Sequence, residues 1–83
     1  MAKFEYDIPE RTLDGIRRYV DQHIVPGGFV LAVLRNELTE AVCRADLDNL
    51  LCLRDIVKYL SNEVPAICWG SPGAVRVWLK AKE

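Results

Sequence analysis

Ser71, His23 and Asp7 are the residue types of a hydrolytic triad, in which a histidine takes the proton of a serine hydroxyl and a carboxylate orients the imidazole. In many such enzymes the serine lies on a sharp turn between a strand and a helix, and no such pattern surrounds Ser71. Ser71 is instead followed by Pro72, which is typical of a helix start with serine as the N-cap and proline as the first helical residue. We therefore predict structural roles for Ser71 and Pro72 and no catalytic residue.

Cysteine chemistry is the next candidate. Cys68 directly precedes a predicted helix N-terminus, where the helix dipole can lower a thiol pKa, but its apolar neighbours suggest burial, which raises it. With Cys43 and Cys52 it forms no CxxC pair, and the single histidine, His23, does not complete a zinc set. We expect the thiols to pack as small hydrophobic side chains and His23 to cap a helix. The sequence predicts no metal site, no cofactor site and no enzyme.

Basic residues could form a patch that binds phosphates. The candidates are Arg11, Arg17, Arg18, Arg35, Arg44 and Arg54. Acidic residues are interspersed among them, and eleven Lys and Arg nearly balance twelve Asp and Glu in the chain. A solvated face with local ion pairs is therefore the favoured interpretation. A nucleic-acid-associated regulator that uses the arginines of the first helix, including Arg17 and Arg18, is kept as the alternative.

Aromatic residues are the candidates for contacting a partner, since tryptophan and tyrosine are enriched in binding hot spots. Trp69 lies in an apolar loop and is the preferred surface anchor. Tyr59, with Cys52, marks a second and weaker contact patch on the wetter side of a helix. Trp78 falls on the inner stripe of the last helix and is predicted to be core. Self-association through either aromatic patch stays open.

A helix over Asp46–Asn62 must position several of these residues, and we expect it to be the central one. Asp46 is its predicted N-cap. Leu50, Leu53, Val57, Leu60 and Val64 recur at helical spacing and form its apolar stripe, which Leu47, Leu51 and Ile56 widen, so the helix is expected to pack on more than one flank. Asn49 lies beside the stripe and is predicted to be an internal clamp that bonds a loop backbone.

Four further helical segments complete the expected fold. They are Pro9–His23, Phe29–Leu34, Glu37–Ala45 and a last helix from Ser71-Pro72 to about Lys82. The apolar run Phe29–Leu34 would suit a buried strand, but its helical spacing and the lack of a second strand-like run favour a helix. Gly15 interrupts the first helix, which indicates either close packing against another backbone or a tolerated glycine.

The whole chain, 1–83, is therefore predicted to be one all-α domain of four to five short helices around a central helix, with residues 1–7 as a flexible or extended arm. A chain of 83 residues has room for one core. The N-terminus lacks the apolar region of a signal peptide, and the longest apolar run is too short to span a membrane. We expect a cytoplasmic protein.

Four segments and one asparagine form the most distinctive pattern of the sequence: Pro26–Phe29, Ala32–Leu38, Ala45-Asp46, Asn49 and Pro65–Pro72. With this pattern the chain resembles a group of small proteins that are encoded by tailed bacteriophages and prophages and have no assigned function. The resemblance brings no catalytic residues. It implies a protein made in the cytoplasm of a bacterial host, where it would bind host or phage macromolecules.

Together these observations predict a non-enzymatic accessory protein. Its expected activity is to bind a host or phage protein through the Trp69 loop and an adjoining helix face, and so to modulate or inhibit a host factor or defence system.

Overall fold

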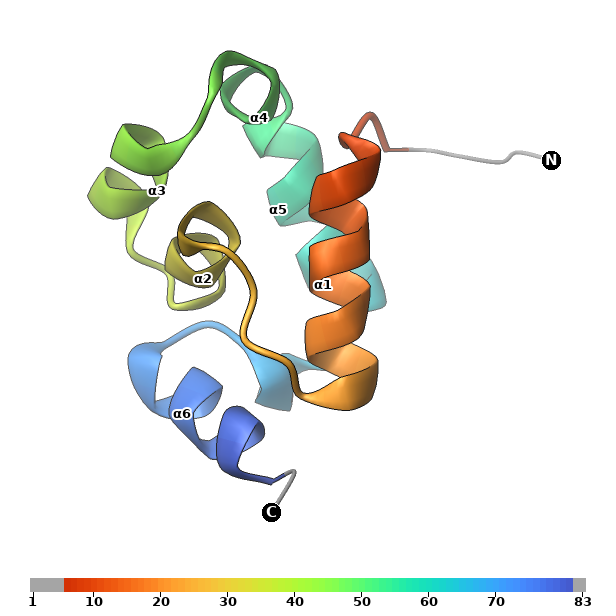
Figure 1. Cartoon of the computed structure of the whole chain (residues 1–83), viewed down its shortest axis with the longest axis vertical. Coiled ribbons are helices and arrows are strands. Elements are labelled where there is room, and N and C mark those ends of the chain that lie inside the picture. Colours follow the sequence, from red (N-terminus) through yellow and green to blue (C-terminus); the bar gives the residue numbers. More distant parts are fainter. Residues whose placement is uncertain (1–5, 82–83) are drawn as a thin grey trace, which may run out of the picture.

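The computed structural model describes residues 6–81, and in this range the chain forms six α-helices, a short 3₁₀ turn and no strand (Figure 1). The predicted all-α single domain is thus confirmed. The part of the predicted N-terminal arm at residues 1–5 and the predicted helix end at Lys82 lie outside the described range. The elements are α1 (Glu10–Gln22), α2 (Gly28–Leu34), α3 (Leu38–Arg44), α4 (Leu47–Leu51), α5 (Leu53–Glu63), η1 (Ala66–Cys68) and α6 (Pro72–Lys80).

The most completely buried helix is α2, which lies between α1, α3 and α6 (Figure 1). Its residues are apolar on every side, and a short helix of this kind can only be stable inside a core. The prediction of a helix for Phe29–Leu34 is confirmed. The buried residues of α2 are Phe29, Val30, Ala32, Val33 and Leu34.

The segment predicted as one central helix is two helices, because the chain breaks at Cys52. Cys52 has φ −102° and ψ 8°, and its N–H is shared between the carbonyl oxygens of Asp48 and Asn49 at 3.2 Å each. The two helices on either side of the break make different tertiary contacts. Asn49 points from α4 to α1, whereas Ile56 of α5 enters the core.

The predicted apolar stripe of this segment is partly wrong. Leu47 and Leu51 are 69% and 75% exposed, and Leu50 and Val57 are 42% and 40% exposed. The buried side chains of α5 are Ile56 and Leu60, while Cys52 and Tyr59, predicted on the wetter side, pack partly buried against the core. The face of α5 that packs against the core is therefore rotated about the helix axis from the predicted face.

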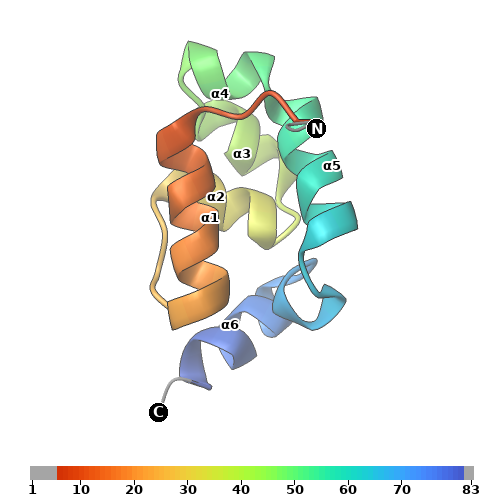
Figure 2. The ribbon, with the colours of Figure 1, turned by 90° about the vertical axis from the view of Figure 1, so that its right-hand side faces the viewer.

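Hydrogen bonds between α1 and the C-terminal part of the chain fix α6 below the ends of α1 and α5 (Figure 2). The buried Tyr19 hydroxyl donates to the Cys68 carbonyl at 2.6 Å, and the Trp78 indole N–H donates to the Tyr19 carbonyl at 2.9 Å. His23 ends α1 in the left-handed conformation, with φ 57°. Its Nδ1 lies 2.7 Å from the Trp78 carbonyl oxygen, and the two rings stack with centroids 4.3 Å apart.

The turn between α2 and α3 is closed by two backbone hydrogen bonds. Asn36 has φ 63°, its N–H donates to the Val33 carbonyl at 3.0 Å, and the Glu37 N–H donates to the Ala32 carbonyl at 2.9 Å. This is the Schellman arrangement, in which a left-handed residue ends a helix. Asn36 is thus the joint between the two helices. The nearby Gly70 N–H donates to the Leu34 carbonyl at 2.7 Å and holds the loop containing Trp69 against the end of α2.

Candidate interaction surface

An apolar groove lies where α2, α3 and α5 meet the loop after η1, and we call it the Trp69 groove. Its volume is about 60 Å³, whereas sites for cofactors and drug-sized ligands are typically about 300–1,000 Å³. The groove is suited to a side chain of a partner and not to a small-molecule cofactor. Its lining residues are Val33, Asn36, Glu37, Leu38, Ala41, Leu53, Val57 and Trp69.

The edges of the Trp69 groove expose apolar side chains to solvent. Leu38 on α3 is 70% exposed and Val57 on α5 is 40% exposed. Val42, one turn after Leu38 on α3, is 43% exposed, and Leu50 on α4 is 42% exposed. Single exposed apolar residues are ordinary in proteins, but a contiguous set beside a groove is typical of an interaction site.

The apolar surface extends to α4, which forms one end of the molecule (Figure 1). Leu47 and Leu51 are four residues apart in this five-residue helix, so they lie on one side of it, opposite the buried Asn49. Sequence reasoning missed this exposure because it placed both leucines in the widened stripe. Asn49 was predicted to face the interior. Because Leu47 and Leu51 lie on the opposite side of the helix, that prediction already implied that both leucines face solvent.

Trp69 and Trp78 are both half-buried and packed against the core. Trp69, the predicted surface anchor, thus presents only part of its ring as one wall of the groove. The predicted core residue Trp78 joins α6 to α1 through its indole N–H, as described above.

Charged residues of both signs lie at the groove: the acidic Glu37 lines it just before α3, and two basic residues lie beside it on α5. Arg54 and Lys58 lie on the exposed side of α5, and the ion pairs within residues 6–81 use only Arg11 and Arg44 as cations. Arg11 pairs with Asp46 and lies 4.0 Å from Asp48, so it engages the carboxylates of α4. In the described range, Arg54 and Lys58 therefore have positive charge free to attract a partner.

Two other predicted contact residues, Tyr59 and Arg17, meet in a separate hollow of about 510 Å³ between α1, α5 and the segment before α1. Tyr6 covers one side of the hollow, with its ring at 87° to that of Tyr59 and 5.4 Å away. The backbone N–H of Asp7 donates to the Asp55 carboxylate at 3.0 Å. The described part of the predicted N-terminal arm is therefore extended along α5.

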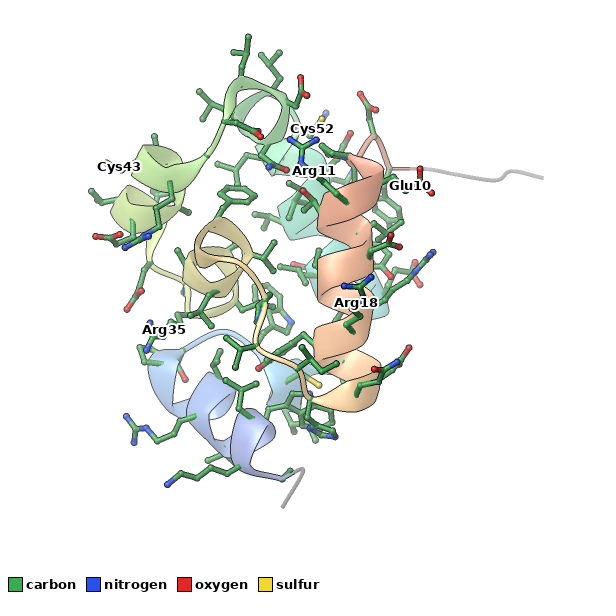
Figure 3. The ribbon with its side chains drawn as sticks, viewed as in Figure 1. Glu10, Arg11, Arg18, Arg35, Cys43 and Cys52 are labelled. Carbon is green, nitrogen blue, oxygen red and sulfur yellow. The ribbon has the colours of Figure 1, made fainter. Side chains whose placement is uncertain are left out.

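Arg18 does not share the hollow of Arg17. It lines another hollow, of about 310 Å³, with Gly15 and Val25, and Arg35 lies on the other side of the molecule (Figure 3). Arg44 forms an ion pair with Glu40 at 2.8 Å. The candidate arginines thus do not form one patch, but Arg35 and Arg44 line one hollow, and Arg11 and Arg18 line another.

The residues considered for chemistry have structural contacts. Ser71 accepts a hydrogen bond from the Ala74 N–H at 3.1 Å and caps α6, and Pro72 is the first residue of that helix, as predicted. Burial raises the pKa of the Cys68 thiol, which opposes its use as a nucleophile. Residues 6–81 contain no group of three or more His, Cys, Asp or Glu side chains that could hold a metal ion. In the same range no helix is both long and apolar enough to cross a membrane.

Asp46 and Asn49 organise the start of α4. The Asp46 carboxylate accepts the Asn49 N–H at 2.9 Å, which confirms the predicted cap. This backbone bond, and then Arg11, lowers the pKa of Asp46. The prediction for the Asn49 side chain is corrected: it accepts a hydrogen bond from the Thr12 hydroxyl of α1 at 2.5 Å, and not from a loop backbone. Both partners are buried, so the bond joins α1 to α4 inside the protein.

No protein-family profile, curated protein or solved structure was found that matches this chain.

Proposed function

We propose that this chain is a non-enzymatic interaction module that binds another protein through the Trp69 groove and the adjoining surface of α3, α4 and α5. The observation that supports the proposal best is the exposure of Leu38, Val57 and the α4 leucines around a groove that is too small for a cofactor. These side chains lie outside the core and contact water, so burying each of them against a partner is favourable.

The energetic argument concerns the gain from covering this surface. Fully burying a leucine or valine side chain is worth about 1.5–3 kcal/mol, and Leu38, Leu47 and Leu51 are each about 70% exposed. Covering these three leucines would contribute roughly 3–6 kcal/mol before the costs of association. Such a gain is suited to a partner that contacts several of these side chains together.

The proposed setting is a bacterial cell that expresses a phage or prophage gene, and it follows from the resemblance of the Cys-Trp-Gly-Ser and Ala-Val-Leu-x-Asn segments to phage proteins. In that setting the partner is a host or phage protein, and binding would modulate or inhibit it.

The test compares capture by the wild-type chain with capture by Leu38→Glu and Val57→Glu variants. Val77→Glu is the matched control, because Val77 on α6 is 69% exposed and Leu38 is 70% exposed. Tagged proteins are incubated with bacterial lysate, and captured proteins are quantified by mass spectrometry. We expect a specific set of proteins that the groove variants lose and the control retains. Equal capture by all four proteins would contradict the proposal.

The nucleic-acid alternative gains no support from the arrangement of the basic residues. Although α2 and α3 form a helix–turn–helix pair, the exposed Leu38, Val42 and Cys43 of α3 are poor partners for phosphates. The one basic residue of α3, Arg44, is already paired with Glu40 at 2.8 Å. We expect no shift of DNA or RNA in gels at low ionic strength, where phosphate contacts are strongest.

A further inference from the structure

We infer that the Trp69 groove receives an amphipathic helix whose acidic residues face α5. The inference rests on the proposed function and deepens it, because it names the kind of segment by which the partner binds.

The shape of the groove indicates a helix. Its two sides are themselves helices, α3 and α5, each with apolar lining residues one turn apart. They are Leu38 and Ala41 on α3, and Leu53 and Val57 on α5. Two such rows leave a furrow in which the side-chain ridge of a third helix can pack. A partner helix would supply apolar anchors at i, i+3 or i+4, and i+7. The Trp69 ring forms one wall and gives a large apolar contact to one anchor.

The charges beside the groove indicate acidic residues on that helix. Arg54 and Lys58 are four residues apart, so they lie on the same side of α5. Val57 is three residues after Arg54 and adjacent to Lys58 in sequence, which places the two cations next to the apolar lining. Both are exposed and have no acidic partner within residues 6–81. On the opposite side of the groove, Glu37 is acidic, and the exposed α3 residues Glu40 and Arg44 pair with each other at 2.8 Å. Charge complementarity is therefore expected along the α5 side.

A second copy of the chain is the main competing occupant, since α4 presents leucines next to aspartates. Its carboxylates are already engaged, however. Asp46 caps α4 and pairs with Arg11, and Asp48 lies 4.0 Å from the same guanidinium. Docking α4 of another copy against Arg54 and Lys58 would compete with these contacts, which favours a different protein as the source of the acidic helix.

The experiment uses two synthetic helical peptides of about five turns, with leucines at heptad a and d positions and either glutamate or lysine at the flanking positions. Each is titrated into the isotopically labelled full chain and followed by NMR. We expect the acidic peptide to shift the amides of Leu38 and Val57 and the Trp69 indole. It should bind about tenfold more tightly than the basic peptide at low salt, since two attractive contacts replace two repulsive ones.

Charge reversal on the protein gives the specific control. The double variant Arg54→Glu, Lys58→Glu should prefer the basic peptide, whereas Arg76→Glu, at an exposed position of α6, should keep the wild-type preference. Sedimentation velocity of the free chain is measured over a range of concentrations. We expect a monomer, and a dimer that Leu38→Glu dissociates would assign the groove to a second copy and overturn the inference.

Other results would also overturn it: no binding of either peptide, equal binding of both, or shifts confined to residues outside the groove. These failures can be distinguished from failure of the proposed function. If lysate capture still depends on Leu38 while the peptides do not bind, the interaction module stands and only its helical, acidic partner is wrong.

Discussion

Tyr19→Phe tests the packing between α1 and the C-terminal part of the chain most directly. Tyr19 is fully buried, and its hydroxyl donates to the Cys68 carbonyl at 2.6 Å. The substitution removes one oxygen and leaves the ring in place, so little packing is lost. It also leaves the backbone carbonyl of the buried Cys68 without its hydrogen-bond donor. An unsatisfied buried acceptor costs about 1–3 kcal/mol.

This cost is large for a domain of this size. At about 0.05–0.15 kcal/mol per residue, 83 residues give a free energy of unfolding of roughly 4–12 kcal/mol. A loss of about 1–3 kcal/mol should lower the melting temperature by roughly 5–20 °C. The control is Tyr6→Phe, because the Tyr6 hydroxyl makes only exposed contacts with Glu63 and Asn62. This variant should lose less than about 0.5 kcal/mol.

The pH dependence of unfolding provides a second measurement on the same pair of proteins. Burial, with a smaller contribution from Cys68, raises the pKa of Tyr19 to about 12, above its ordinary value of about 10. Between these values the unfolded chain releases the Tyr19 proton and the folded chain retains it, so stability falls as pH rises. As pH rises through this range, ionisation of Tyr19 should lower the free energy of unfolding of the wild type by up to about 2–3 kcal/mol. Tyr19→Phe has no phenol at this position and should not show this loss.

The assay is urea unfolding of both proteins, followed by circular dichroism at pH 8 and at several values up to pH 11.5, with a reductant present. Taking the difference between the two proteins removes contributions from lysines and from the other tyrosines. We expect the advantage of the wild type to shrink above pH 10. A constant difference across this range, or a difference below about 0.5 kcal/mol at pH 8, would refute the reasoning.

Three further predictions concern local interactions, each measured by thermal or urea unfolding. Gly15→Ala should stabilise the chain by about 0.5–1 kcal/mol, because a Cβ there meets no atom within 4 Å and alanine favours the helix; destabilisation would show that the site is closed. Asp46→Ala should cost about 0.5–2 kcal/mol through loss of the α4 cap, whereas Asp48→Ala should change stability by less than about 0.5 kcal/mol; equal effects would argue against the cap. Thr12→Val and Asn49→Leu should each cost about 1–3 kcal/mol, and the double variant should cost less than their sum, because neither buried partner is then left unpaired; strict additivity would contradict the buried bond.

The positions of the helices could largely be predicted from sequence because short-range chemistry determines them. Asp46, Ser71 and Pro72 act within one turn of their own backbone, and Pro65 stops α5 at the residues before it. The helical state of Phe29–Leu34 followed from spacing and from the absence of a second strand-like run. The break at Cys52 did not follow, since neither proline nor glycine marks it and tertiary contacts on its two sides accompany it.

The candidate site could be predicted only in part. Trp69 lies at the groove, but Leu38 and the α4 leucines were not singled out as contact residues. Tyr59 and Arg17 were separate candidates on different helices, and the fold places them in one hollow. Nothing within a few residues of either could indicate this, because the N-terminal segment and two helices must first be packed together.

The sequence by itself determined where most helices begin and end and that their apolar sides would close one core, since caps, prolines and periodicity act on the nearest backbone. Only the tertiary structure decided which leucines stay in water. Leu60 and Leu51 belong to the same predicted helix, yet one is fully buried and the other is 75% exposed. Burial depends on how far the neighbouring helices reach, and at the end of the molecule no other described helix extends over α4 (Figure 1).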